Sequence, residues 1–103
     1  MAAAIYDLFI EQGVDYVEGI DITGSYTGYS IRGTIKDRAG VLTPNIVSWV
    51  DESIGELEVT LTDLQTEAMS SGLGKYDIEI VSPTGIVSRI LKGRVYVDSE
   101  VTI

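Results

Sequence analysis

The sequence predicts an all-β protein: a single antiparallel β-sandwich of immunoglobulin-like character, with about seven strands and one short helix near residues 63–69. Apolar and polar residues alternate with a period of two over several short stretches, and glycine-bearing turns separate these stretches. The chain has 103 residues, 45% of them hydrophobic, which suits one domain with one core over residues 1–103. A small β-barrel is the alternative.

The first two expected strands are the least regular. Residues 5–12 and 14–22 contain strand-like apolar stretches. In the second, we expect a register change near Gly19 to bring Val17, Ile20 and Ile22 onto one face.

Residues 29–36 alternate most clearly, with Ile31 and Ile35 on the apolar side. Gly33 shares that side, where we expect it to leave room for a bulky neighbour from the facing sheet. Residues 41–51 contain Pro44, which predicts a bend or an edge strand because proline cannot donate to a sheet ladder. Trp49 is a natural centre for the core.

The C-terminal half predicts strands at 56–62 and 75–81 and one or two further strands over 86–97, with a bulge or bend at Gly93. Between the first two, Thr62 and Gln65 have the spacing of a capping box. Leu64, Ala68 and Met69 follow at helical spacing, which predicts about two turns of helix.

Charge and composition restrict the function classes. Sixteen acidic and seven basic residues give a net charge of −9, and the basic residues are scattered along the chain, so we expect no nucleic-acid or membrane partner. Cysteine and histidine are absent, which excludes disulfides, thiolate metal sites and every Ser-His or Cys-His nucleophile. The first residues lack the basic stretch of a signal peptide, which predicts a product that stays in the cytoplasm where it is made or is assembled there into something larger.

The remaining polar residues do not predict an enzyme, a metal site or a cofactor. Asp77 and Glu79 share one face of one strand, which predicts a solvated face rather than a catalytic acid pair across a substrate. The acids near turns are dispersed and lack the spacing of a calcium loop. Tyr26, in a loop, is a surface candidate for stacking on a sugar ring.

Four segments resemble a known family: "FIEQGVDY", "DITGSYTGYSIRGTIKD", "GELEVTLTDLQTEAM" and "GKYDIEIVSPTGIVSRILKGRVYVDSEVTI". Their order is similar to that in small virion proteins of tailed bacteriophages, and in the immunoglobulin-like N-terminal domain of phage baseplate upper proteins. The resemblance covers about residues 9–103. It departs at Ser25 and Tyr26, where the family more often has a Leu-Thr-Gly-Tyr run.

The resemblance implies a non-enzymatic virion structural protein, a small tail, baseplate or fibre-attachment adaptor that docks onto other virion proteins. Capsid decoration and recognition of a host-surface carbohydrate are the alternatives. We expect multiple copies in a symmetric assembly, built in the host cytoplasm. The C-terminal end is the first docking candidate, through Val97, Val101, Thr102 and Ile103; the same residues also suit the last strand of the domain's own sheet.

Overall fold

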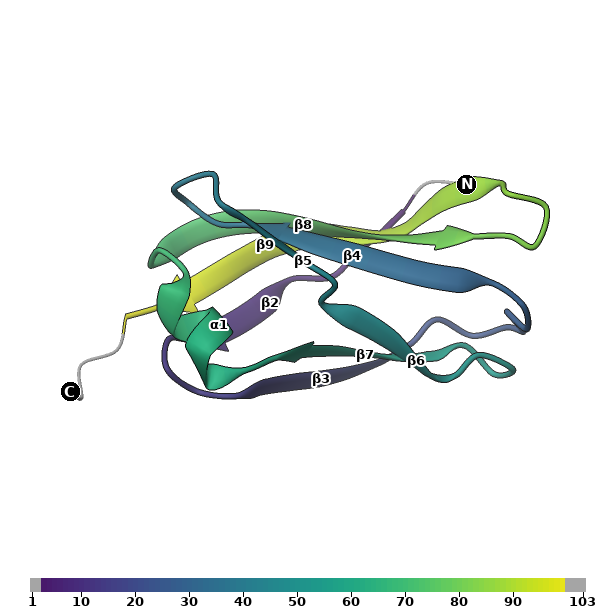
Figure 1. Cartoon of the computed structure of the whole chain (residues 1–103), viewed down its shortest axis with the longest axis horizontal. Helices are drawn as coiled ribbons and strands as arrows, with labels where there is room; N and C mark the ends of the chain where they lie inside the picture. The colour runs from purple at the N-terminus through teal and green to yellow at the C-terminus, as the bar shows by residue number, and fades with distance from the viewer. Residues whose placement is uncertain (1–2, 100–103) are drawn as a thin grey trace.

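The computed structural model describes residues 3–99 and has the predicted fold class, with two β-sheets packed face to face (Figure 1). Sheet A consists of β1 (Ala4–Ile5), β2 (Leu8–Glu11), β4 (Ser30–Lys36), β5 (Leu42–Pro44), β8 (Gly72–Val81) and β9 (Val87–Asp98). Sheet B consists of β3 (Tyr16–Asp21), β6 (Val47–Asp51) and β7 (Glu56–Leu61). The single helix of the described part, α1 (Asp63–Ala68), lies at one end of the sandwich (Figure 1).

The strand order is that of an immunoglobulin sandwich. Sheet A runs β9-β8-β4-β5, which corresponds to strands G-F-C-C′, and sheet B runs β3-β7-β6, which corresponds to B-E-D. Two expected strands are each divided, 5–12 into β1 and β2 and 41–51 into β5 and β6, so the described strands outnumber the predicted seven.

The sheets are mainly antiparallel, as predicted, but one edge of sheet A is parallel. Both β1 and β2 pair with β9 in parallel, because the first and last strands of the chain run side by side in the same direction.

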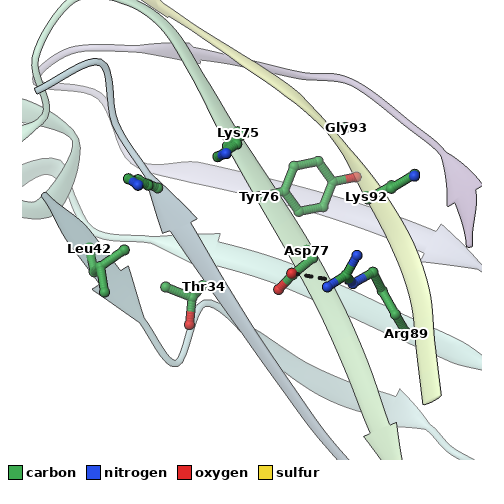
Figure 2. A pocket seen from close by; sticks show the side chains of 9 residues that line it. Thr34, Leu42, Lys75, Tyr76, Asp77, Arg89, Lys92 and Gly93 are labelled. Carbon is green, nitrogen blue, oxygen red and sulfur yellow. Dashed lines mark ion pairs between the residues drawn. The ribbon is translucent and has the colours of Figure 1, made fainter. Parts of the chain in front are cut away.

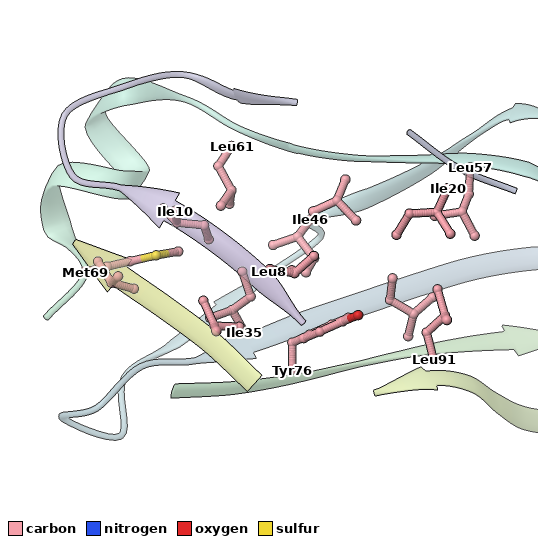
Figure 3. Packing of buried hydrophobic residues seen from close by; sticks show 14 residues of the cluster. Leu8, Ile10, Ile20, Ile35, Ile46, Leu57, Leu61, Met69, Tyr76 and Leu91 are labelled. Carbon is pink, nitrogen blue, oxygen red and sulfur yellow. The ribbon is translucent and has the colours of Figure 1, made fainter. Parts of the chain in front are cut away.

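The core lies between the inner faces of the two sheets, and alternation predicted most of it (Figure 3). Gly33 leaves room for a side chain of the facing sheet, as predicted, because a Cβ placed there would lie 3.1 Å from the Val47 side chain of sheet B. The most deeply buried side chains are Leu8, Ile10, Ile35, Ile46, Leu57, Val59, Ile78 and Val95.

Two expectations about inward faces are wrong. Strand β3 pairs with β7 in unbroken register through Gly19, so Val17 points outward and is 64% exposed.

In α1 the capping box of Thr62 and Gln65 is confirmed, but Leu64 is exposed. The buried helical side chain is Thr66, whose hydroxyl donates to the Val14 carbonyl at 2.9 Å. This hydrogen bond connects the buried side of α1 to the β2–β3 loop.

The β5–β6 segment passes from sheet A to sheet B, and β5 lies at an edge, which is one of the two positions that Pro44 predicted. Pro44 ends the edge strand β5, and Asn45 follows with φ of 59°, a left-handed conformation that asparagine tolerates. Ile46 is then fully buried, while its backbone N–H donates to Gly33 in one sheet and its carbonyl accepts from Thr60 in the other. The crossing thus keeps its backbone groups hydrogen-bonded.

The N-terminal segment is anchored at the break between β1 and β2. The Tyr6 N–H donates to the Lys92 carbonyl, and the Asp7 carboxylate accepts from the Arg94 N–H, both at 2.9 Å. Gly93 is not the predicted bulge, since the register of β8 and β9 shifts beside Ile78 and Glu79 instead. Gly93 permits close approach, because a Cβ there would lie 2.3 Å from the Tyr6 carbonyl oxygen.

Tyrosine hydroxyls complete this anchor. The buried Tyr76 hydroxyl donates to the Tyr6 carbonyl, and the exposed Tyr6 hydroxyl donates to the Glu18 carboxylate of sheet B. Burial raises the pKa of Tyr16 to about 12 and raises the pKa of Tyr76 further, and the hydrogen bond to Glu18 raises the pKa of Tyr6. The folded state therefore favours the protonated, neutral form of these three tyrosines.

We expect Tyr76→Phe to lower the free energy of unfolding at neutral pH by about 1–2 kcal/mol, because the Tyr6 carbonyl loses its buried donor. The pKa of Tyr76 is raised in the folded state, so its stabilisation is complete below pH of about 10 and declines as the pH rises above that value. The variant should therefore lose less stability between pH of about 10 and 12 than the wild type.

Urea unfolding across this pH range measures both effects. Tyr26→Phe is the control, because it removes a hydroxyl whose bond to the Thr23 carbonyl is exposed. Equal alkaline losses in Tyr76→Phe and wild type would contradict the anchor.

Candidate functional site

The fold gathers basic side chains that are scattered in the sequence. All seven are exposed on sheet A or in its β4–β5 turn, and those on strands alternate with core residues such as Ile35 and Val95. They therefore lie on the outer face of sheet A. They are Arg32, Lys36, Arg38, Lys75, Arg89, Lys92 and Arg94.

The opposite half of the molecule contains the net negative charge. Residues 12–28 and 45–71, which include β3, β6, β7 and α1, have no lysine or arginine. Their nine acidic residues equal the net charge of −9, and the rest of the chain is balanced. The nine are Asp15, Glu18, Asp21, Asp51, Glu52, Glu56, Glu58, Asp63 and Glu67.

Asp77 and Glu79 point outward from β8, as predicted, and each forms an ion pair with a different arginine. The Glu79 carboxylate lies 2.9 Å from Arg32 of β4, and the Asp77 carboxylate lies 3.4 Å from Arg89 of β9. Asp77 and Arg89 line a shallow hollow of about 410 Å³ with Lys75 and Lys92 (Figure 2). The two carboxylates are therefore used in separate cross-strand ion pairs, which makes a shared acid–base role a poor fit to this geometry.

An exposed apolar cluster, the aromatic patch, lies at one end of the same face. It consists of Phe9 on β2, Tyr96 on β9 and Leu73 on β8, which occupy matching positions on three neighbouring strands. The Phe9 and Tyr96 rings are stacked, with centroids 5.1 Å apart. Their exposed fractions are 69% for Phe9, 50% for Leu73 and 37% for Tyr96. Alternation assigned these residues to the solvent face but could not reveal that they are adjacent.

Of the four predicted C-terminal docking residues, the structure describes only Val97. Val97 is only 5% exposed and belongs to the core cluster, so its side chain is committed to the domain's own sandwich, as the alternative in the sequence analysis allowed. Val101, Thr102 and Ile103 lie outside the described residues.

Tyr26 does lie in a loop, but it is half-buried against other aromatic side chains. Its ring stacks on Trp49 at 5.5 Å and meets Tyr29 edge-on at 5.7 Å. Trp49 is not the centre of the core: it lies on edge strand β6, where its indole N–H donates to the Tyr29 carbonyl at 3.0 Å. Tyr26 and Tyr29 line a hollow of about 640 Å³ with Ser88, Arg89 and Lys92 among its other walls.

The described part of the chain contains neither a metal-binding cluster nor a membrane-spanning helix. Among residues 3–99, no group of three Asp or Glu side chains is placed to hold a metal ion. The helix in this range is also too short and too polar to cross a membrane.

Comparison of the sequence with protein-family models finds no match, and comparison with curated proteins finds none either.

Proposed function

We propose that this protein is a non-enzymatic structural adaptor that docks onto other proteins of an assembly. The observation that carries the proposal is the aromatic patch, three large apolar side chains exposed side by side on one rigid sheet. Aromatic side chains are enriched at the energetic centres of protein interfaces, because they bury much area at low entropic cost. A partner that covered the patch would remove this apolar surface from water.

The patch lies beside an edge that a partner strand can extend. Strand β2 has β9 as its neighbour, and its other side is the edge of sheet A in the described structure. Unpaired backbone groups on such an edge can add a strand from another chain, while neighbouring side chains supply specificity. Patch and edge together form one docking region at the end of the sandwich.

The resemblance to small immunoglobulin-like phage proteins supports the assembly that we propose, a bacteriophage virion built in the host cytoplasm. The leading location is the tail or baseplate, where the chain would mount fibres, and capsid decoration is the alternative. A small domain offers each partner little area, so multivalent attachment through several symmetry-related copies suits it. Val101, Thr102 and Ile103 follow β9 in sequence and remain proposed docking residues.

Quantitative mass spectrometry of purified particles, with heads and tails separated, tests this location. We expect the chain in the tail fraction at a few copies per particle. Abundance comparable to the major capsid protein, in the head fraction, would support decoration instead. Absence from both fractions would contradict the virion role.

Within the same particles, Phe9→Ser should lower incorporation by about five- to thirtyfold, the effect of losing about 1–2 kcal/mol at an interface anchor. The side chain is mostly exposed, so the isolated domain should remain folded by circular dichroism. The matched control is Val17→Ser, which removes an equally exposed apolar side chain from sheet B. Equal losses in both variants, or none in Phe9→Ser, would contradict docking through the patch.

Recognition of a host-surface carbohydrate is the second candidate, and the hollow beside Tyr26 and Tyr29 favours it. Aromatic walls with a few polar groups, here Ser88 and Arg89, are typical of small-ligand sites. We expect Tyr26→Ala to abolish binding on a glycan array, while Tyr26→Phe, which keeps the ring, retains it. An array without hits, or unchanged binding by Tyr26→Ala, would exclude this function.

A further inference from the structure

Three cations stand side by side on neighbouring strands of sheet A. Lys36 of β4 lies directly opposite Lys75 of β8, and Lys75 lies directly opposite Arg94 of β9. Like charges at directly opposed positions of a sheet destabilise the fold. The arrangement therefore has an energetic cost that no core packing requires, since all three side chains are exposed on the outer face.

A fourth cation completes the group. Arg38 extends from the β4–β5 turn over Gly72, where a Cβ would lie 2.7 Å from the arginine Cδ. Gly72 also has φ of 117°, so the position favours glycine and leaves room for this side chain. The four side chains line one hollow of about 440 Å³, the cationic hollow: Lys36, Arg38, Lys75 and Arg94.

Within residues 3–99, no direct ion pair joins any of the four cations of this hollow to a carboxylate. The ion pairs among residues 3–99 are those of Arg32 and Arg89, and neither arginine belongs to the hollow. Asp37 also lines it, but this carboxylate is buried and accepts from the backbone N–H groups of Val41 and Ser70, at 3.0 and 3.2 Å. Arg94 differs from the other three, because the Tyr96 side chain and the nearby Asp7 carboxylate raise the pKa of its guanidinium.

We propose that the cationic hollow binds an acidic segment of a partner protein, with carboxylates at the four cations and an apolar side chain against Leu73. Leu73 lines both the hollow and the aromatic patch, so the two surfaces are continuous. Arginine and lysine at neighbouring positions suit carboxylates, which they bind through charge-assisted hydrogen bonds.

A protein segment fits better than a nucleic acid. The half of the molecule that holds the net charge of −9 would repel a long polyanion. A short acidic and apolar segment uses both the charges and the apolar surface. Assigning that segment to a virion protein rests on the proposed function, whereas binding itself needs only the purified chain.

The test is titration of the full-length chain with a capped peptide, Glu-Glu-Leu-Glu-Glu-Gly, at low ionic strength, followed by amide chemical shifts. We expect the largest shifts at the strands around the hollow, and weaker binding as salt is added. Lys75→Glu should weaken binding by about five- to tenfold. The matched control is Lys92→Glu, which makes the same change of charge on the same face but outside the hollow; it should bind nearly as the wild type does.

Thermal unfolding separates loss of binding from loss of folding. Lys75→Glu places a carboxylate between Lys36 and Arg94, so its Tm should rise by about 1–5 °C while binding falls. Four results would overturn the proposal: no peptide binding, equal weakening by both variants, equal binding of the glutamine version of the peptide, or tighter binding of a thymidine hexanucleotide. These results are obtained without particles, so they are distinguishable from failure of the virion role.

Discussion

The register of β8 against its two neighbours is the constraint on which the rest of the structure depends. Strand β8 lies between β4 and β9 and pairs with both along most of its length. Because side chains alternate across a strand, this register sends Tyr76 and Ile78 into the core and Leu73 and Lys75 to the outer face. A shift by one residue would exchange these faces, and burial of the core therefore fixes the outer surface as well.

Two features that we assign to binding follow from that register. It sets Lys75 between Lys36 and Arg94, and it sets Tyr96 between Leu73 and Phe9. The second alignment also needs the parallel pairing of β2 with β9, which the Asp7 carboxylate and the Tyr76 hydroxyl hold in place near Gly93. Anchoring of the N-terminal segment and formation of the aromatic patch are thus parts of one arrangement. The exposed cations and aromatic rings add little to the core, which is the pattern expected where stability is given up for binding.

Local pattern was enough to predict the fold class and much of the core. Alternation placed Ile35, Leu57 and Ile78 inside, and the capping box located α1, because both signals depend on residues close in sequence. The parallel edge was not predicted, since nothing within residues 5–12 indicates which strand will lie beside them. The same limit hid the candidate site: Lys36, Lys75 and Arg94 are far apart in the chain, and only the sheet register makes them neighbours. Trp49 was wrongly predicted as the centre of the core, because side-chain size does not reveal that its strand lies at an edge. Val17 was wrongly predicted to share a face with Ile20, because the register of β3 against β7 continues unbroken through Gly19.

The central claim is that the outer face of sheet A is the face that meets a partner, and hydroxyl-radical footprinting tests it most directly. The chain would be oxidised both free and within its isolated assembly, and modification would be measured residue by residue. The account predicts that Phe9, Leu73 and Tyr96 become protected in the assembly, while the exposed Val17, Val50 and Ile54 on the sheet B side remain as reactive as before. Protection of the sheet B residues alone, or of neither group, would contradict it.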